Sequence, residues 1–300
     1  MSASMYAKIT ALFFVLTALL MALGYVVGWY FFGDPITFVG LALVLAAAIN
    51  FISYYYSDAI VLRMSKAKII QEGDNPTLFK VVRNVAQKAN IPMPKVGIVD
   101  SQQPNAFATG RGPNKAVVCA TSSILQTLTP DELEAVIGHE MGHVVHRDVL
   151  MSSVAATLAG AISYIGQMAM FSMWFGGGNR NRNGGSPLFI LAIVLVPLGA
   201  TFVRLGISRD DEYSADEYGA KLTRNPAGLV TALQKISTRS QTRPIATNPA
   251  KAPSPATASL WIVNPFKGSS LIEMFSTHPS LAHRVDRLRK IGHEMNVYVP

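Results

Sequence analysis

Two long runs without a charged residue dominate the N-terminal part of this chain of 300 residues. The first extends from Ile9 to Gly33 and the second from Pro35 to Ser57, and only Asp34 separates them. Because the hydrocarbon core of a bilayer needs about 20 apolar residues per helix, each run is long enough to cross it. Gly, Asp and Pro favour turns. The sequence therefore predicts two transmembrane helices, at about 9–32 and 36–57, joined by a tight turn.

A cleaved signal peptide is the alternative interpretation of the first run. Its apolar segment is longer than the roughly 7–15 residues typical of a signal peptide. No clear small-x-small cleavage site precedes the turn. We therefore expect the first helix to be retained.

A second pair of uncharged runs extends from Val149 to Asn179 and from Asn183 to Val203. Their lengths predict another transmembrane hairpin, at about 150–175 and 187–206, which interrupts a soluble domain. Pro187 lies near the start of the fourth helix, where a helix tolerates it. The alternative is a buried hydrophobic hairpin of a soluble domain, but the length and the absence of charge argue against it.

The charge distribution sets the expected orientation. Half of the residues are hydrophobic, 15% are charged and the net charge is +8. The basic residues do not form a stripe interleaved with aromatics, so we expect no nucleic acid partner. With both termini in the cytoplasm, Arg180 and Arg182 are the only two of the 26 Lys and Arg residues outside, as the positive-inside rule requires. The single cysteine, Cys119, excludes an intrachain disulfide, and its apolar neighbours predict a buried thiol rather than a nucleophile.

The motif His139-Glu140-Met141-Gly142-His143 lies near the end of a well-signalled helix. Thr129 is a capping residue, Pro130 suits the first helical position and Glu132 can complete a capping box. Because residues four apart share a helix face, both imidazoles can bind one ion with Glu140 beside them. This arrangement gives a zinc hydrolase two ligands and a carboxylate that takes a proton from metal-bound water. A surface helix with solvated His and Glu side chains is the alternative.

The remaining soluble elements are expected around this helix. Asn75-Pro76 opens an amphipathic helix, and a strand is expected at Lys95–Val99. A hairpin with strands Asn105–Thr109 and Ala116–Ala120 follows. After the fourth apolar run we expect helices from Ser208 to the Asn225-Pro226 break, at about 227–236, and at about 279–291, the last entered through Thr277-His278. Residues 240–258 are rich in Pro, Ala, Thr and Ser and predict a mobile loop or linker.

Two histidines do not complete a zinc site, so a third ligand must come from elsewhere. Glu212 is the better candidate, because it lies on the next helix outside the membrane and shares a face with Asp216. One carboxylate can bind the metal while the other orients a ligand imidazole. His146 is the alternative, but three ligands on one helix would crowd one side of the ion. A solvated acidic face is the other interpretation of Glu212 and Asp216.

The motif HEMGH with the following Arg147-Asp148, and the segment Ser208–Asp216, resemble the HtpX family of membrane zinc proteases, relatives of the CaaX prenyl endopeptidases. The resemblance covers essentially the whole chain and includes the two pairs of apolar runs, the Asn105–Gly110 segment and Thr277-His278-Pro279. It implies one zinc ion per chain, bound by His139, His143 and Glu212. It also implies that Glu140 is the general base and that Asp216 supports a ligand.

The same resemblance assigns Asn105, His278 and Arg284 to the polar groups around the scissile bond. We expect His278 and Arg284 to stabilise the tetrahedral oxyanion; a helix-cap histidine and a surface arginine are the alternatives. The strand that begins with Asn105, Ala106 and Phe107 is expected to pair with an extended polypeptide substrate. A purely structural strand is the alternative.

We therefore expect a mainly α integral membrane protein with four transmembrane helices and a zincin-like metalloprotease domain that contains a small β-sheet or hairpin. Residues 1–57 and 149–207 form the membrane hairpins, and residues 58–148 and 208–300 form the two parts of the protease domain. Both termini and the active site are expected on the cytoplasmic face of the plasma (inner) membrane. The short distance from the motif to the adjoining spans places zinc within roughly 10–15 Å of the bilayer surface.

The expected activity is zinc-dependent cleavage of misfolded or misassembled membrane proteins, and the family resemblance implies a role in quality control and the stress response. A prenyl-peptide endopeptidase and a non-catalytic, zinc-stabilised membrane scaffold are the alternatives. An intramembrane protease is disfavoured, because charged residues surround the His139–His143 motif.

Overall fold

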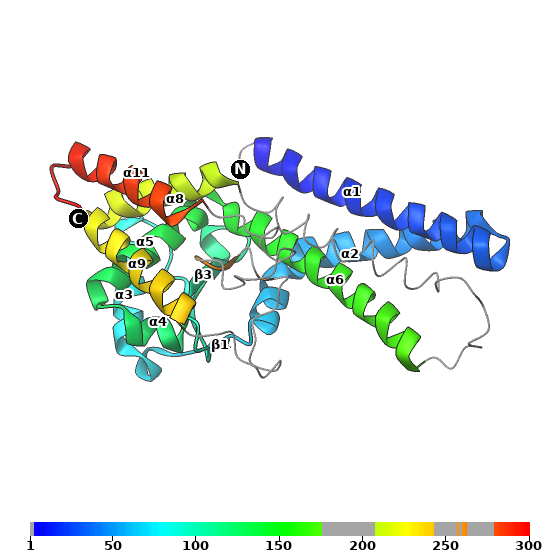
Figure 1. Ribbon diagram of the computed structural model, residues 1–300, viewed down its shortest axis with the longest axis horizontal. Coiled ribbons are helices and arrows are strands. Elements are labelled where there is room, and N and C mark those ends of the chain that lie inside the picture. The colour runs from blue at the N-terminus through cyan, green and yellow to red at the C-terminus, as the bar shows by residue number, and fades with distance from the viewer. Residues whose placement is uncertain (1–2, 176–207, 243–256, 258–259, 263–278) are drawn as a thin grey trace.

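A helical hairpin projects from one end of a mixed α and β domain (Figure 1). The computed structural model describes residues 3–175, 208–242, 257, 260–262 and 279–300. The fourth expected transmembrane helix and His278 therefore lie outside the described residues, as does nearly all of the expected loop at 240–258.

The hairpin consists of α1 (Ala3–Val27), a π-helical turn η1 (Gly28–Phe32) and α2 (Pro35–Met64). Asp34 caps α2 by accepting a hydrogen bond from the Thr37 N–H at 3.2 Å, and Gly33 takes the positive φ of +69° that the turn requires. Both helices are long and apolar enough to cross a bilayer. Helix α2 continues past the expected end at 57, because Asp58 and Arg63 end the apolar run without ending the helix.

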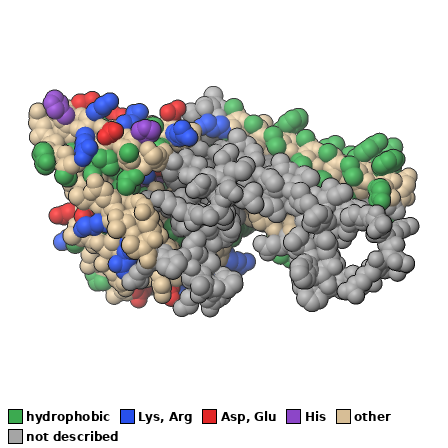
Figure 2. Space-filling model, in the orientation of Figure 1, with side chains coloured by type: hydrophobic (Ala, Val, Ile, Leu, Met, Phe, Trp, Pro, Cys, Tyr) green, Lys and Arg blue, Asp and Glu red, His purple; other side chains and the backbone are tan. Residues whose placement is uncertain are grey.

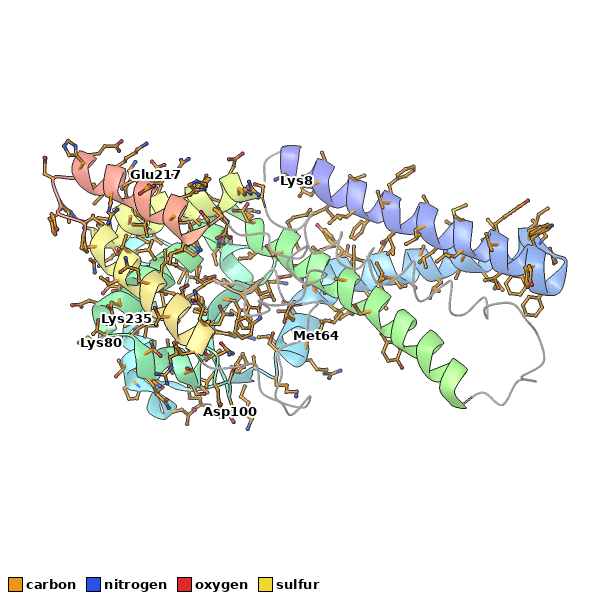
Figure 3. All side chains as sticks on the ribbon, viewed as in Figure 1. Lys8, Met64, Lys80, Asp100, Glu217 and Lys235 are labelled. Atoms are coloured by element: carbon orange, nitrogen blue, oxygen red, sulfur yellow. The ribbon has the colours of Figure 1, made fainter. Side chains whose placement is uncertain are left out.

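Large apolar side chains are exposed along this hairpin, as Figure 2 shows for α1, whereas charged side chains gather on the domain. Lys8 and Met64, near the first residue of α1 and at the last residue of α2, lie at the end of the hairpin that faces the domain (Figure 3). Lys8 Nζ is 3.5 Å from Asp211 Oδ2, at the start of a domain helix. The polar ends of the hairpin therefore adjoin the domain, and its turn points away.

A four-stranded sheet forms one layer of the domain, in the order β1-β2-β4-β3. Strands β2 (Lys95–Val99) and β4 (Val117–Thr121) are parallel, whereas β3 (Ala106–Thr109) is antiparallel to β4 and forms an edge of the sheet. The expected strand and hairpin are confirmed. The two-residue strand β1 (Lys68–Ile69), antiparallel to β2, was not expected, because two residues are too few to show an alternating pattern.

Helices cover this sheet and form the core with it. Helix α3 (Pro76–Lys88) begins at its Asn75 cap, and the apolar face of this expected amphipathic helix is buried through Leu78, Val81, Val82, Val85 and Ala86. Helix α5 (Pro130–His146) contains the HEMGH motif and packs between α3, α8 and α9. The remaining described domain elements are η2 (Glu72–Asp74), η3 (Pro113–Lys115), α4 (Ser122–Thr127), α8 (Arg209–Thr223), α9 (Pro226–Thr242) and α11 (Leu281–Glu294).

Two expected helix boundaries are wrong. Helix α9 extends to Thr242 instead of ending near 236, because its buried face continues through Ile236 and Ser237. Helix α11 begins at Leu281 and ends at Glu294 instead of spanning about 279–291, and Ser280 caps it by accepting a hydrogen bond from the His283 N–H at 3.3 Å. A serine hydroxyl satisfies one of the N–H groups that a helix start leaves without a partner.

Helix α6 (Asp148–Phe175) follows α5 after a single residue, Arg147, whose φ is +69°. It packs against α2 and carries an apolar stretch from Asp148 to Tyr164. It corresponds to the third expected transmembrane helix. Because its partner at 187–206 lies outside the described residues, the four-helix membrane topology stays a prediction.

Candidate metal centre

The helix that carries the motif begins as its sequence requires. The Thr129 hydroxyl accepts a hydrogen bond from the Glu132 N–H at 3.3 Å, and the Glu132 carboxylate accepts one from the Thr129 N–H at 2.9 Å. This capping box fixes the first turn of α5. Helix α8 begins in the same way, with Ser208 and Asp211 as the reciprocal pair. The side chain of Asp211 therefore caps the start of α8, and it is distinct from the carboxylates of the metal site.

Helices α5 and α8 approach each other through glycines. A Cβ atom on Gly219 would lie 2.5 Å from the backbone nitrogen of His139, and one on Gly142 would lie 2.9 Å from the Cα atom of Ala215. Such distances are too short for a real Cβ atom, so the two backbones pack directly together. This contact brings Glu212, on α8, within reach of the two motif histidines on α5.

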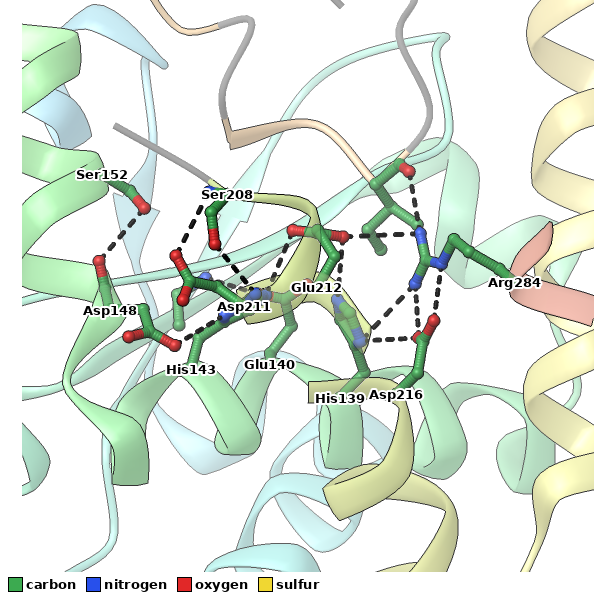
Figure 4. A network of polar contacts seen from close by, with 12 residues as sticks. His139, Glu140, His143, Asp148, Ser152, Ser208, Asp211, Glu212, Asp216 and Arg284 are labelled. Carbon is green, nitrogen blue, oxygen red and sulfur yellow. Dashed lines mark hydrogen bonds and ion pairs between the residues drawn. The ribbon is translucent and has the colours of Figure 1, made fainter. Parts of the chain in front are cut away.

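The three expected ligands form one cluster (Figure 4). His143 Nε2 lies 3.4 Å from Glu212 Oε1, and His139 Nε2 lies 3.8 Å from Glu212 Oε2. When one donor atom is taken from each of the three side chains, these atoms all lie within 4.8 Å of one another. Zinc ligands at about 2.0–2.1 Å in a tetrahedron are about 3.3 Å apart, so this donor set fits a zinc ion after small side-chain shifts.

Asp216 fixes the orientation of the first ligand. Its Oδ1 atom lies 2.9 Å from Nδ1 of His139, and both side chains are buried. A proton on Nδ1 leaves the lone pair on Nε2, the nitrogen that faces Glu212. Burial by itself would raise the pKa of Asp216, but the charge of Arg284 and the contact with His139 bring this pKa below its ordinary value. Asp216 therefore stays ionised and can keep accepting this hydrogen bond.

The charges around His143 favour a cation. Burial by itself would lower the pKa of His143, but contacts with Asp148 and Glu212 raise this pKa well above its ordinary value. Nδ1 of His143 lies 3.5 Å from the Asp148 carboxylate. Carboxylates that hold a proton on a buried imidazole equally favour a divalent cation in its place.

Glu140 lies beside the ligands and contacts the edge of the sheet. Its Oε2 atom accepts a hydrogen bond from the Ala108 N–H of β3 at 3.0 Å. Burial raises the pKa of Glu140 above its ordinary value, which brings a carboxylate closer to the range suited to a general base. The arrangement therefore brings the candidate metal-binding triad, the carboxylate expected as the general base and an edge strand to one place.

The sequence pattern of peptidase family M48 matches residues 72–292, which include the sheet, α5 and α8. The chain belongs to peptidase family M48. Three proteins described as protease HtpX homologs align over nearly their whole length. The one from Thermococcus sibiricus is 45% identical over 301 residues, 99% of either chain. The one from Pyrococcus furiosus is 46% identical over 94% of each chain, and the one from Nostoc sp. is 44% identical over 96% of this chain and 97% of the relative.

Among solved structures, that of Ste24p from S. mikatae aligns with 96% of this chain and 67% of its own, at 18% identity and a TM-score of 0.47. The family membership makes this chain an M48 metalloprotease of the HtpX type. The cluster of His139, His143 and Glu212 fits the zinc site of such an enzyme.

Three further residues of this M48 chain were expected at the site, namely Asn105, Ala106 and Phe107. Phe107 lines the cavity beside the ligands, together with Ala108, Glu140, Leu260 and Ile262. Asn105 is buried, and its side chain binds the backbone of residues 260–262. Ala106, between Asn105 and Phe107, is the first residue of β3.

Arg284 is 2% exposed, so the alternative of a surface arginine is wrong. Its guanidinium forms a two-point ion pair with Asp216 and lies 3.6 Å from Glu212 Oε2. His146 packs against Tyr218, with ring centroids 5.5 Å apart, and is not part of the ligand cluster. Its spacing from His143 would allow a common face, and it is the contact with Tyr218 on α8 that engages its ring elsewhere.

Residues 260–262 also lie at the site, although no pattern in the sequence predicts them there. Leu260 and Ile262 line the cavity, and Trp261 is 8% exposed. These residues belong to no motif. The signal that marks them is a short apolar run, Leu260-Trp261-Ile262, directly after the polar stretch at 240–258.

Proposed function

We propose that this chain is a zinc-dependent endopeptidase that holds one zinc ion between α5 and α8 and cleaves misfolded or misassembled membrane proteins at the cytoplasmic face. The convergence of His139, His143 and Glu212, with Glu140 beside them, carries this proposal. Among the described residues the cluster contains three protein ligands, as catalytic zinc sites do, whereas a structural site has four. This argues against the zinc-stabilised scaffold.

Zinc, when bound, supplies a Lewis acid and lowers the pKa of a coordinated water. Glu140 takes the proton of the attacking water and delivers it to the leaving amine. The Glu140 carboxylate is held for this task by the Ala108 N–H. Asp216 keeps His139 in the tautomer that presents Nε2 to the ion.

Substrate binding is assigned to β3 and the groups around it. Strand β3 is an edge strand, and its Ala108 N–H points toward Glu140 rather than toward β4. An extended polypeptide can therefore pair with this edge next to the general base. Arg284 donates from Nη1 to the carbonyl of Ile262 at 3.3 Å, which supports its proposed role in binding a substrate carbonyl or oxyanion. His278 is proposed for the same role on the family resemblance alone.

The position of the site favours membrane-protein substrates. Helix α5 passes into α6 through Arg147, and α8 begins beside Lys8 of the hairpin. The ligands therefore lie close to the ends of apolar helices. We propose four transmembrane helices in the plasma (inner) membrane with both termini in the cytoplasm, as the positive-inside rule favours, and a role in quality control during stress.

Reconstitution in liposomes tests the catalytic assignment. The wild-type chain with zinc is expected to cleave a misfolded membrane substrate, to stop on chelation and to recover on zinc addition. Glu140→Ala is expected to bind zinc but to lose about 10²–10⁴-fold in rate. Glu217→Ala, which removes an exposed carboxylate on α8, is the matched control. Full activity of Glu140→Ala would refute the mechanism, and a strong preference for prenylated over plain peptides would favour the prenyl-peptide endopeptidase.

A further inference from the structure

Residues Leu260–Ile262 lie against the metal centre and are bound through their backbone. Asn105 Nδ2 donates to the Leu260 carbonyl at 3.0 Å, and Asn105 Oδ1 accepts from the Ile262 N–H at 2.9 Å. Arg284 Nη1 donates to the Ile262 carbonyl at 3.3 Å. Asn105 and Arg284 are 1% and 2% exposed. Buried side chains thus bind three backbone polar groups of this segment, namely the Leu260 carbonyl and the N–H and carbonyl of Ile262.

Asn105 and Arg284 offer this segment groups that the backbone of a bound peptide could also use, and Leu260 itself lies in a 3-10 turn and Ile262 in a bend. The side-chain amide of Asn105 offers one donor and one acceptor, as a backbone peptide group does. It binds the carbonyl of Leu260 and the N–H of Ile262, two residues later. All three hydrogen bonds use the backbone of the segment, so the contact does not depend on which side chains the segment carries.

The segment also fills the space in front of the base and the ligands. Leu260 and Ile262 line the same cavity as His139 and Glu140. In the part of the chain that the structure describes, about 30 Å³ remains free there. This volume accommodates one or two water molecules and no peptide. A substrate that reaches the metal centre must therefore move these residues.

We propose that Leu260–Ile262 is an internal pseudo-substrate, which occupies the peptide-binding site until an extended polypeptide displaces it. This inference rests on the proposed endopeptidase function. It gives the site a regulatory element: a folded protein offers no extended segment to compete with the three hydrogen bonds, whereas an unfolded segment does. The rival interpretation is that the segment is a fixed wall of the substrate cleft.

The two interpretations predict opposite changes in kcat/KM when the segment is loosened. Ile262→Pro removes the N–H that Asn105 binds, and Ile262→Ala keeps it. For an internal pseudo-substrate, kcat/KM on an extended fluorogenic peptide is expected to rise at least threefold in Ile262→Pro and less in Ile262→Ala. For a fixed wall, loosening the segment lowers kcat/KM. An unchanged or lower value in a folded Ile262→Pro enzyme overturns the proposal.

A second experiment follows the segment without the need for catalysis. In a full-length chain with Trp29→Phe and Trp174→Phe, Trp261 is the single tryptophan and is 8% exposed. Binding of the probe peptide acetyl-Leu-Phe-Ile-amide is expected to shift its emission to longer wavelength and to increase acrylamide quenching. The analogue with an N-methylated Ile lacks the critical N–H, and is expected to require at least a tenfold higher concentration.

The two proposals fail in different ways. If the zinc-loaded wild-type chain cleaves peptides but the probe leaves Trp261 unchanged at concentrations that inhibit cleavage, the pseudo-substrate is overturned and the endopeptidase stands. If Trp261 responds as described but the zinc-loaded chain cleaves nothing, the peptide-binding site stands and the endopeptidase fails. Both of these outcomes are read without the Ile262→Pro variant, so they hold whether or not that variant folds.

Discussion

The carboxylate of Asp216 and the guanidinium of Arg284 meet at two points, with Nη2 to Oδ1 at 2.6 Å and Nε to Oδ2 at 2.8 Å. The same carboxylate contacts Nδ1 of His139 at 2.9 Å. Both members of the pair are nearly inaccessible to solvent, at 1% and 2% exposure. The pair therefore holds the imidazole of His139, a proposed zinc ligand, in a fixed orientation, and we expect its removal to weaken metal binding.

Asp216→Asn tests the effect on the metal. The amide keeps the shape of the side chain but loses the charge that orients His139. We expect zinc affinity to fall about 10–100-fold, as for other groups that orient a ligand imidazole. Competition with a chromophoric chelator measures this affinity. Asp210→Asn, the same change at an exposed position of α8, is the control; equal affinities in the two variants would contradict the assigned role of Asp216.

Arg284→Met tests the ion pair itself. It leaves a buried carboxylate without its charged partner, which typically destabilises a fold by about 3–5 kcal/mol. The double variant Arg284→Met with Asp216→Leu removes both charges and is expected to recover most of the loss. Thermal unfolding in detergent measures both effects. If Arg284 acted on the substrate alone, its replacement would lower kcat and leave the unfolding midpoint unchanged.

Gly219→Ala tests the contact between α5 and α8. Alanine normally favours a helix over glycine by about 1 kcal/mol. Here the added methyl would lie 2.5 Å from the His139 nitrogen, so α8 must shift and carry Glu212 away from the histidines. We expect lower thermal stability and at least a tenfold loss of zinc affinity. Gly40→Ala on α2, where nothing lies within 4 Å of the added methyl, is expected to do neither. Equal behaviour of the two variants would mean that the close approach does not position the site.

The reactivity of the Cys119 thiol tests whether the interior of the sheet is closed to solvent. Burial raises the pKa of its thiol to about 12. At pH 8 a thiol with an ordinary pKa is partly thiolate, the reactive form. We therefore expect the native thiol to react with a disulfide reagent at least about 10³-fold more slowly than the unfolded chain does. Comparable rates before and after denaturation would show that β4 is open to solvent.

Much of this site follows from local sequence signals. The Thr129-Pro130-Asp131-Glu132 sequence predicts the start of α5, and the spacing of His139 and His143 predicts their common face, because caps and helical periodicity depend on neighbouring residues. Glu212 required a further inference, since its distance from the motif in the sequence says nothing of its distance in space. The small residues Gly142 and Gly219 are the sequence signal for that approach, and they are recognisable only once the pairing of α5 and α8 is known.

The partners of Arg284 and Asn105 could not be predicted from the sequence, for a different reason. An arginine in an amphipathic helix is usually exposed, and only the tertiary fold shows that Asp216 compensates its burial. Likewise, nothing in the sequence around Leu260 indicates that its backbone binds Asn105. Contacts between segments that carry no motif depend on the packing of the whole domain.

Zinc K-edge X-ray absorption on the loaded chain tests the central assignment most directly. We predict a first shell of nitrogen and oxygen atoms at about 2.0–2.1 Å, with the multiple scattering of two imidazoles and without sulfur. Glu212→Ala is predicted to alter this shell and to reduce zinc binding. A spectrum with a different number of imidazoles, or one that Glu212→Ala leaves unchanged, would contradict a site built from α5 and α8.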